Sequence, residues 1–310
     1  MKIVVIGNGK MAADCIKMML NQTVHQLSYV FYEADKNVQP KVLLDCIEEN
    51  QIPSAAIIKI HDEGNLNVLE ELQPDWIFNI NCYQYLRAIV LSKAKCGVIN
   101  FHNGPLPRYG GVNIPTWVIL NGEQQHGVTW HLVNEAIDAG DILEQSTFEL
   151  SSKITAAQLM VKCIQEGIRL FEENWICWIE GHTKPRVQNG ERLYFGLKDK
   201  VNHEGMLSAN NTSVDWDRTV RALHLFPYLN DVAYAHIKIQ HQKYFAIAGK
   251  IIDNDISHPI GTITLDQPTG FAVQLSDGHY LITQLADEEW KLIKPKDLAL
   301  ICGCSNSMIE

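Results

Sequence analysis

The sequence contains no apolar run that approaches the ~18 residues needed to cross a membrane, so no membrane span is expected. Its first residues, MKIVVIG, lack the long apolar region and the small-residue cleavage site of a signal peptide. Together these absences predict a cytoplasmic chain whose cysteines are mostly reduced.

The eight cysteines include no C-x-x-C pair. Cys302 and Cys304 form a C-x-C near the C-terminus, but no second pair matches it, so a zinc site is not expected. Positive charge is also scarce, with 26 Lys and Arg against 36 Asp and Glu and a net charge of −10. Proteins that grip nucleic-acid phosphates usually carry a basic patch or stripe, so this balance disfavours a nucleic-acid partner.

The first half of the chain alternates short apolar runs with helical patterns. Such alternation predicts a Rossmann-like, doubly wound α/β sheet with helices on both faces and a ligand site beyond the carboxyl ends of the strands. Strands are expected at residues 3–6, 27–32, 55–60, 75–86 (ending in a short loop), 98–101 and 128–133, and helices at 11–20, 40–49, 65–72 and 155–180.

After Val232 the pattern changes to short strands separated by turn signals, which is typical of a small β-barrel. We therefore expect a first domain at residues 1–182, a polar linker rich in Gly and Pro at 183–205, and a smaller OB-like domain at 206–310. The barrel strands are expected at residues 233–239, 245–248, 261–265, 271–275 and 280–283.

The glycine turn GNGKMAA at residues 7–13 is a partial dinucleotide fingerprint. Such a fingerprint also needs an acidic residue after the second strand, and Glu33 or Asp35 could fill that position. A dehydrogenase that binds NAD is therefore an alternative, although the stronger signal lies further along the chain.

That stronger signal begins with Asn100 and His102, which lie two apart on an expected strand and so share one face of the sheet. A loop rich in Gly and Pro follows at residues 103–111. Asp138 lies later, in the turn-rich sequence IDAGD. These side chains could serve as an oxyanion donor, a general acid or base, and a carboxylate that orients it. Each also has an ordinary structural role, as a hydrogen-bonded pair or a turn residue.

The order and spacing of the surrounding pieces resemble the folate-dependent formyltransferase family. That family includes enzymes that formylate methionyl-tRNA, glycinamide ribonucleotide and certain amino sugars, and its longer members carry a comparable C-terminal domain. The matching pieces are Asn100-x-His102, the Pro-containing loop at 104–107, GVNIPTWVILNG at 111–122, GVTWH at 127–131 and IDAGDI at 137–142.

The resemblance implies 10-formyltetrahydrofolate as donor, a primary amine as acceptor, and no metal. It implies catalytic roles for Asn100, His102 and Asp138, with His131 as a support residue. The stretch at residues 75–86, where the strand leaves the sheet into a short loop, resembles the part of the family that wraps the pterin ring. Residues expected to contact the folate are Asn81, Tyr83, Gln84, Leu86, Gly104, Pro105, Leu106, Pro107, Ile137, Gly140 and Asp141.

The acceptor is harder to read from the sequence. Enzymes specific for tRNA usually carry a basic inserted loop and a serine-containing S-L-L-P, whereas this chain has EADKNVQP at residues 33–40 and NGPLP at 103–107. The stretch HNGPLPRYGG instead resembles formyltransferase domains of nonribosomal peptide or polyketide assembly. We therefore expect a small or carrier-tethered aminoacyl amine, in a chain that could be one part of a larger synthetase. Methionyl-tRNA and a nucleotide-linked amino sugar are the alternatives. A formylfolate hydrolase and a non-catalytic folate-binding module are the alternatives from other classes.

Overall fold

The computed structural model describes residues 1–34, 41–225, 230–253, 255–264, 270–293, 297 and 308–309. The predictions for Asp35, Cys302 and Cys304 lie outside these residues. The chain forms two compact units, and each is described by itself. The N-terminal unit contains Met1–Ile114, Gln125–Glu149 and Met160–Phe195, and the C-terminal unit contains Pro115–Gln124, Leu150–Leu159 and Gly196–Glu310.

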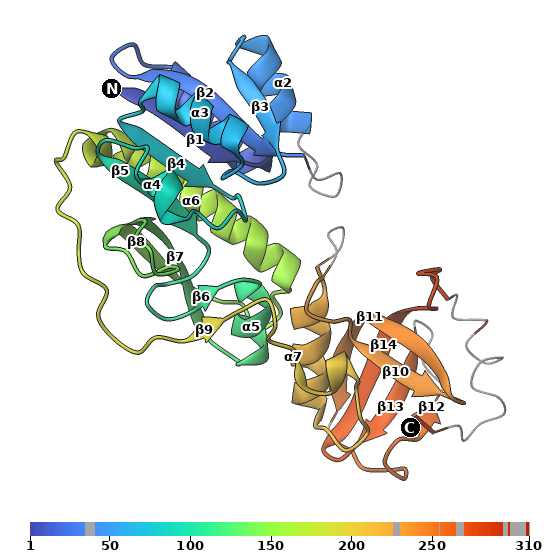
Figure 1. The fold of residues 1–310 in the computed structure, drawn as a ribbon. Helices are drawn as coiled ribbons and strands as arrows, with labels where there is room; N and C mark the ends of the chain where they lie inside the picture. The colour runs from blue at the N-terminus through green and yellow to red at the C-terminus, as the bar shows by residue number, and fades with distance from the viewer. Residues whose placement is uncertain are drawn as a thin grey trace. The chain divides into compact units, whose positions relative to one another are not determined.

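The N-terminal unit is built on a seven-stranded sheet in the order β3-β2-β1-β4-β5-β7-β8 (Figure 1). The first five strands in this order are parallel, whereas β7 runs antiparallel to β5 and β8 runs antiparallel to β7. The predicted Rossmann-like α/β sheet is therefore confirmed, with an antiparallel edge in addition. Its strands are β1 Lys2–Gly7, β2 Gln26–Glu33, β3 Ser54–Ile57, β4 Trp76–Ile80, β5 Gly97–His102, β7 Gln125–Leu132 and β8 Ile142–Glu149.

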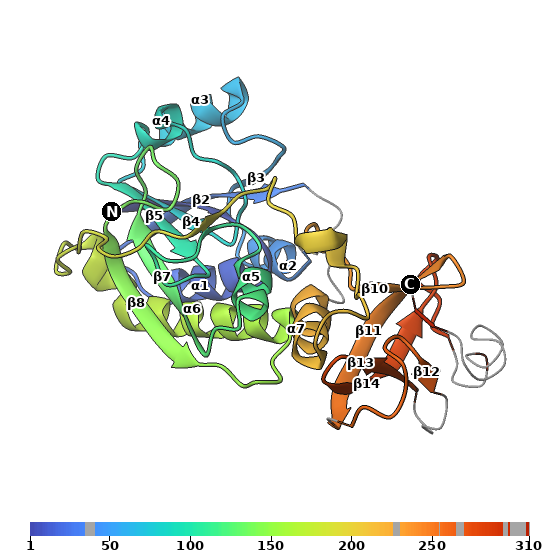
Figure 2. The ribbon, with the colours of Figure 1, turned by 90° about the horizontal axis from the view of Figure 1, so that it is seen from below.

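Helices cover both faces of this sheet (Figure 2). Helices α3 (Glu63–Leu72) and α4 (Ala88–Leu91) place Leu69 and Val90 in a core cluster with residues of β1 and β4. The opposite face receives α1 (Gly9–Leu20), with α2 (Lys41–Glu49) packed beside it, and the long helix α6 (Ala156–Ile179). Among the residues that the structure describes, no helix is long and apolar enough to cross a membrane.

Helix α6 begins at the capping box predicted from the sequence. The Thr155 hydroxyl accepts from the Gln158 amide, and the Gln158 side chain accepts from the Thr155 amide. Further along, Phe171 packs edge-on against Phe78 of β4 and contacts Trp130 of β7. This aromatic core fixes β4 and β7 on either side of β5, and these three strands carry the polar residues described below.

The C-terminal unit contains a separate antiparallel sheet in the order β10-β11-β14-β13-β12. Helix α7 (Ser213–Leu223) packs on it, with the Trp216 ring edge-on to Tyr280 of β14. The short helix α5 (Ile114–Leu120), from its second residue on, and η1 (Asn202–Gly205) belong to the same unit. Closure of the sheet into an OB-like barrel stays a prediction. The strands are β10 His236–Ile239, β11 Gln242–Asp253, β12 Ile263–Thr264, β13 Phe271–Leu275 and β14 Gly278–Ala286.

The segment expected as a linker, residues 183–205, is divided between the two units at Phe195. Its first part returns along the N-terminal unit, where β9 (Tyr194–Phe195) pairs in parallel with β6 (Gly110–Gly111). Strand β6 lies at the end of the Gly/Pro loop that follows His102.

Candidate active site

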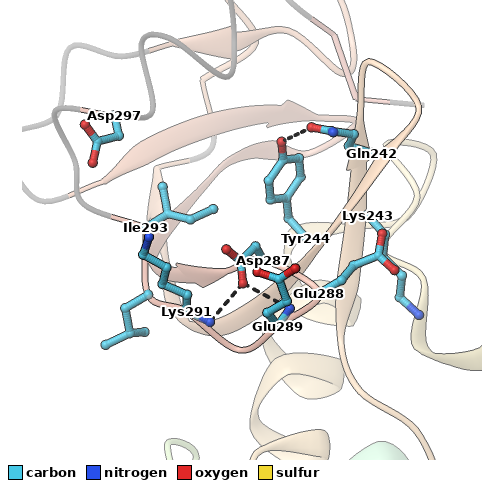
Figure 3. Close-up of a pocket in the computed structure, with 10 residues that line it drawn as sticks. Gln242, Lys243, Tyr244, Asp287, Glu288, Glu289, Lys291, Ile293 and Asp297 are labelled. Carbon is cyan, nitrogen blue, oxygen red and sulfur yellow. Dashed lines mark hydrogen bonds between the residues drawn. The ribbon is translucent and has the colours of Figure 1, made fainter.

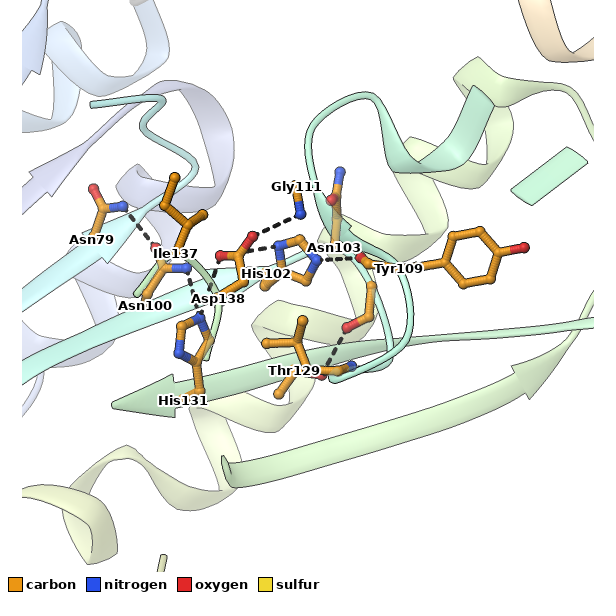
Figure 4. A network of polar contacts seen from close by, with 12 residues as sticks. Asn79, Asn100, His102, Asn103, Tyr109, Gly111, Thr129, His131, Ile137 and Asp138 are labelled. Atoms are coloured by element: carbon orange, nitrogen blue, oxygen red, sulfur yellow. Dashed lines mark hydrogen bonds and ion pairs between the residues drawn. The ribbon is translucent and has the colours of Figure 1, made fainter. Parts of the chain in front are cut away.

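Three polar side chains lie in a row across neighbouring strands because of the strand register. Asn79 of β4 is opposite Asn100 of β5, and Asn100 is opposite His131 of β7. The side chains are joined in the same order: Asn79 Nδ2 donates to Asn100 Oδ1 at 2.7 Å, and Asn100 Nδ2 lies 3.0 Å from His131 Nε2 (Figure 4). The row fixes the orientation of the Asn100 amide from both sides.

The hydrogen bonds of His131 define its tautomer. His131 Nδ1 lies 2.8 Å from the carbonyl oxygen of Leu132, which can only accept, so Nδ1 carries the proton. Nε2 is then free to accept from Asn100. Burial lowers the pKa of His131 to about 4, against the opposing effect of Asp138, so the ring is neutral at pH 7.

His102 lies at the end of β5 and is buried. Its Nε2 is 2.7 Å from the carbonyl oxygen of Tyr109, so this nitrogen must donate. Its Nδ1 faces Asp138 Oδ1 at 3.7 Å (Figure 4). The imidazole is therefore held on one side by a carbonyl and faces a carboxylate on the other.

Asp138 lies between the two histidines. Its Oδ1 is 3.9 Å from His131 Nε2, and its Oδ2 accepts from the backbone amide of Gly111 at 2.8 Å. The Asp138 backbone has a φ of +51°, in the left-handed region that residues other than glycine seldom adopt. Its side chain is only 12% exposed. The structure thus brings together Asn100, His102 and Asp138, the three residues predicted from the sequence.

The loop at residues 104–107 is pinned by two polar side chains of β7 and β8. The Thr129 hydroxyl donates to the Gly104 carbonyl at 2.7 Å and accepts from the Leu106 amide at 3.2 Å. Gln145 donates to the Leu106 carbonyl at 2.8 Å. A Cβ on Gly104 would lie 2.8 Å from His102 Nε2, so only glycine fits here. Gly104 therefore lies next to His102, and the peptide bond between Leu106 and Pro107 is cis.

The loop after β4 contains four of the residues expected to contact the folate. Asn81 has a φ of +53°, and the Tyr83 side chain is 66% exposed. Gln84 donates to Glu33 at 2.8 Å and accepts from the Ile60 amide at 3.2 Å. Leu86 differs from the other three because its side chain is buried in the core cluster.

Glu33, which the NAD alternative needed for ribose binding, has other partners. Its carboxylate accepts from the side chains of Asn8 and Gln84, and its amide donates to Asn8. Asn8 is fully buried after the glycine turn. The glycine turn, the end of β2 and the loop after β4 are thereby tied together by side chains.

The loop at residues 137–141 is held mainly through its backbone. Arg192 donates to the Ile137 carbonyl at 2.6 Å, and Gln188 donates to the carbonyl of Gly140 at 2.7 Å. The Asp141 carbonyl accepts from the Leu132 amide. Ile137 itself is 44% exposed and borders the network in Figure 4.

Several residues of this network were not predicted from the sequence. Thr129 lies within the matching piece GVTWH, but no role was predicted for it. Strand β8, which carries Gln145, was not predicted, and Gln188 and Arg192 fell in the expected linker. Side chains that bond to backbone carbonyls follow no recurrent sequence motif, so they could not be recognised. The contact between Asn79 and Asn100 could have been predicted only from the register of β4 and β5.

A hollow of about 480 Å³ lies in the C-terminal unit (Figure 3). Its carboxylates include Asp287, whose Oδ1 accepts from the backbone amides of Glu289 and Lys291 and so shapes a turn. This hollow lacks the convergence of imidazole, amide and carboxylate seen beside β5. Within the described ranges, no group of three or more His, Cys, Asp or Glu side chains could hold a metal ion.

The site beside β5 combines an oriented amide, an imidazole and a carboxylate. Such a set can stabilise an oxyanion with the amide and move a proton with the imidazole. These are the requirements of acyl transfer to a nucleophile.

Comparison with known proteins gives consistent results. The chain is 26% identical over 291 residues to the methionyl-tRNA formyltransferase of Clostridioides difficile, which covers 92% of each protein. An N-formyltransferase from Helicobacter canadensis, solved with folinic acid and dTDP-3-aminofucose, shares the fold with a TM-score of 0.69 at 21% identity, covering 92% of this chain and 99% of that one. The sugar 3N-formyl transferase WlaRD gives the same TM-score and identity, covering 92% of this chain and 97% of that one.

The family model for formyl transferases matches residues 1–173, which is more than half of the chain and includes Asn100, His102 and Asp138. The protein therefore belongs to the formyl transferase family.

Proposed function

We propose that the protein transfers a formyl group from 10-formyltetrahydrofolate to the nitrogen of a primary amine. The observation that carries this proposal is the convergence of Asn100, His102 and Asp138 at the end of β5, with 3.7 Å between His102 Nδ1 and Asp138 Oδ1. Complexes of the structural relatives with folinic acid and 5-N-formyl-THF support a folate donor for this chain.

Asn100 is the proposed oxyanion donor. When an amine attacks the formyl carbon, the formyl oxygen gains negative charge. The Asn100 amide nitrogen has two hydrogens, and the contact with His131 uses one of them, which leaves the other to donate to that oxygen. Because His131 and Asn79 hold the amide in advance, little reorganisation is needed, and one such donor contributes about 10²–10³ in rate.

His102 is the proposed proton carrier. Its Nδ1 can take the proton that the attacking amine loses, and the nearby Asp138 carboxylate stabilises the resulting imidazolium. The same nitrogen can return the proton to the folate nitrogen as the carbon–nitrogen bond to the donor breaks. The proton count is then balanced, because one proton leaves the amine and one reaches the leaving nitrogen.

The folate would lie along the loops at residues 81–86, 104–107 and 137–141. Exposed Tyr83 and Ile137 offer apolar surface, while the carbonyls and amides of these loops offer hydrogen bonds. The side chain of Leu86 packs in the core and so supports the loop at residues 81–86.

We propose a small or carrier-tethered aminoacyl amine as acceptor. The net charge of −10 and the short, non-basic segment at residues 33–40 support this class over tRNA. The names of the relatives favour the two alternatives: methionyl-tRNA from the sequence relatives and a nucleotide-linked amino sugar from the solved structures. The domains at 1–182 and 206–310, and an OB-like barrel in the second, remain our proposed organisation.

The test supplies 10-formyltetrahydrofolate with each of three acceptors: an aminoacyl pantetheine thioester, methionyl-tRNA and a nucleotide-linked amino sugar. Mass spectrometry should find one added formyl group on the thioester at the highest rate, and Asn100→Ala should lower that rate by about 10²–10³-fold. Formate release without a formylated amine would instead identify a hydrolase, and folate binding without turnover would identify a non-catalytic module. Either result would overturn the proposal.

A further inference from the structure

Residues 186–195, called here the return segment, run back beside the loop that carries Asp138. Arg186 and Ile142 exchange backbone hydrogen bonds of 2.7 and 2.8 Å. At the other end, the Leu193 carbonyl accepts from the Gly110 amide at 2.9 Å, and β9 pairs with β6. The return segment is thus joined to both sides of the site through its backbone.

Two side chains of the return segment bind the backbone of the Asp138 loop. Gln188 Nε2 donates to the carbonyls of Asp138 and Gly140, at 2.9 and 2.7 Å, which uses both hydrogens of its amide. Arg192 donates to the Ile137 carbonyl at 2.6 Å. The three bonded carbonyls surround the left-handed backbone of Asp138, a conformation that persists only where its surroundings enforce it.

The return segment also supports the other partner of His102. The Phe195 ring stacks on Tyr109, with ring centres 5.9 Å apart and planes 21° apart. The Tyr109 carbonyl accepts from His102 Nε2, while Asp138 faces Nδ1 (Figure 4). Both nitrogens of the imidazole therefore face groups that one short segment holds in place.

We propose that Gln188 and Arg192 are positioning residues that hold the Asp138 carboxylate against His102. This inference rests on the proposed function, because it assigns the two residues to the formyl-transfer site. Neither side chain is placed on the reacting atoms. Their effect passes through the backbone of residues 137–140, and a displacement of about 1 Å in such a group can cost 10²-fold in rate.

The kinetic test compares Gln188→Ala with Asn189→Ala, an exposed neighbour in the same segment. Gln188→Ala should lower kcat by about 10–100-fold, while the Kd for 5-formyltetrahydrofolate, an unreactive probe that would also contact residues 137–141, changes by a clearly smaller factor. Asn189→Ala should match the wild type. Arg192→Ala should lower kcat similarly, and Arg192→Lys, which keeps a donor for Ile137, should recover most of the loss. Equal losses in Gln188→Ala and Asn189→Ala, or no recovery with lysine, would contradict the proposal.

A second measurement needs no substrate. The Gly111 amide donates to Asp138 Oδ2, so its hydrogen exchange reports whether the carboxylate stays in place. Exchange at Gly111 should accelerate at least tenfold in Gln188→Ala and remain unchanged in Asn189→Ala. Unchanged exchange in both variants would overturn the positioning role even in an active enzyme. Absence of formyl transfer by the wild type would overturn the proposed function and leave this exchange test to decide the positioning role.

Discussion

Each unit of the protein contains a histidine paired with an aspartate, and the two pairs differ in what surrounds them. In the C-terminal unit, His279 Nδ1 lies 2.8 Å from Asp253 Oδ1, closer than the 3.7 Å between His102 and Asp138. Yet His279 and Asp253 are direct cross-strand partners of β14 and β11, and the Asp253 side chain is 47% exposed. Distance alone would therefore select the wrong pair.

The pair in the N-terminal unit is distinguished by convergence from separate segments. His102 comes from β5, Asp138 from a loop and His131 from β7, and all three are buried or nearly so. In the C-terminal unit, a buried polar side chain can instead serve only to satisfy nearby backbone groups. The Gln274 side chain, for example, bonds to the backbone of Ser257, His258 and Gly278. An ionisable group is a stronger functional candidate when its partners come from different parts of the chain and leave a reacting atom accessible.

The largest expected effect is on kcat, and it distinguishes the two histidine–aspartate pairs directly. His102→Ala should lower kcat for formyl transfer by at least about 10²-fold, because it removes the proposed proton carrier. His279→Ala, which removes the closer pair, should leave kcat within about twofold of the wild type. Steady-state kinetics of both variants under saturating donor provide the measurement. A near-normal rate for His102→Ala, or a large loss for His279→Ala, would reverse the assignment.

The sequence was sufficient to predict which side chains meet in the N-terminal site, because their placement follows strand periodicity and family spacing. Asn100 and His102 lie two apart on a strand, so they share a face, and the family spacing added Asp138. The roles of Gln188 and Arg192 could not be predicted, because a polar segment with Gly and Pro has the same composition whether it is a linker or binds carbonyls. Strand β8 was missed because only its first two residues are buried, so it lacks a clear alternation.

The next largest effect is on the pH dependence of stability, and it comes from His131, the neutral histidine that orients Asn100. Burial lowers the pKa of His131 to about 4 in the folded chain, whereas an unfolded chain protonates histidine near 6.5. Protons therefore favour the unfolded chain between these values, and the stabilisation present at pH 7 is lost as the pH falls toward about 4. His131→Gln keeps an acceptor for Asn100 but cannot titrate. Between pH 7 and 4.5, its free energy of unfolding should therefore fall by about 2 kcal/mol less than that of the wild type.

Urea unfolding at several pH values measures this difference. The comparison must be made between the variant and the wild type, because burial also lowers the pKa of His236 and gives both chains a similar slope. Parallel pH profiles for the two chains would show that His131 is not held neutral by its site.

The smallest effect tests whether the closer pair does anything beyond joining two strands. The hydrogen bond from His279 lowers the pKa of Asp253, so its contribution to stability is present above the normal carboxyl pKa and disappears as the pH falls through the lowered one. Because Asp253 is half exposed, solvent screens the pair, and a double-mutant cycle of Asp253→Asn and His279→Ala at pH 6 should give a coupling of about 0.5 kcal/mol. A coupling above about 2 kcal/mol, or a loss of formyl transfer in Asp253→Asn, would mean that this exposed cross-strand pair contributes more to stability or activity than its exposure implies. The contrast between local pairing and convergence would then no longer identify the site.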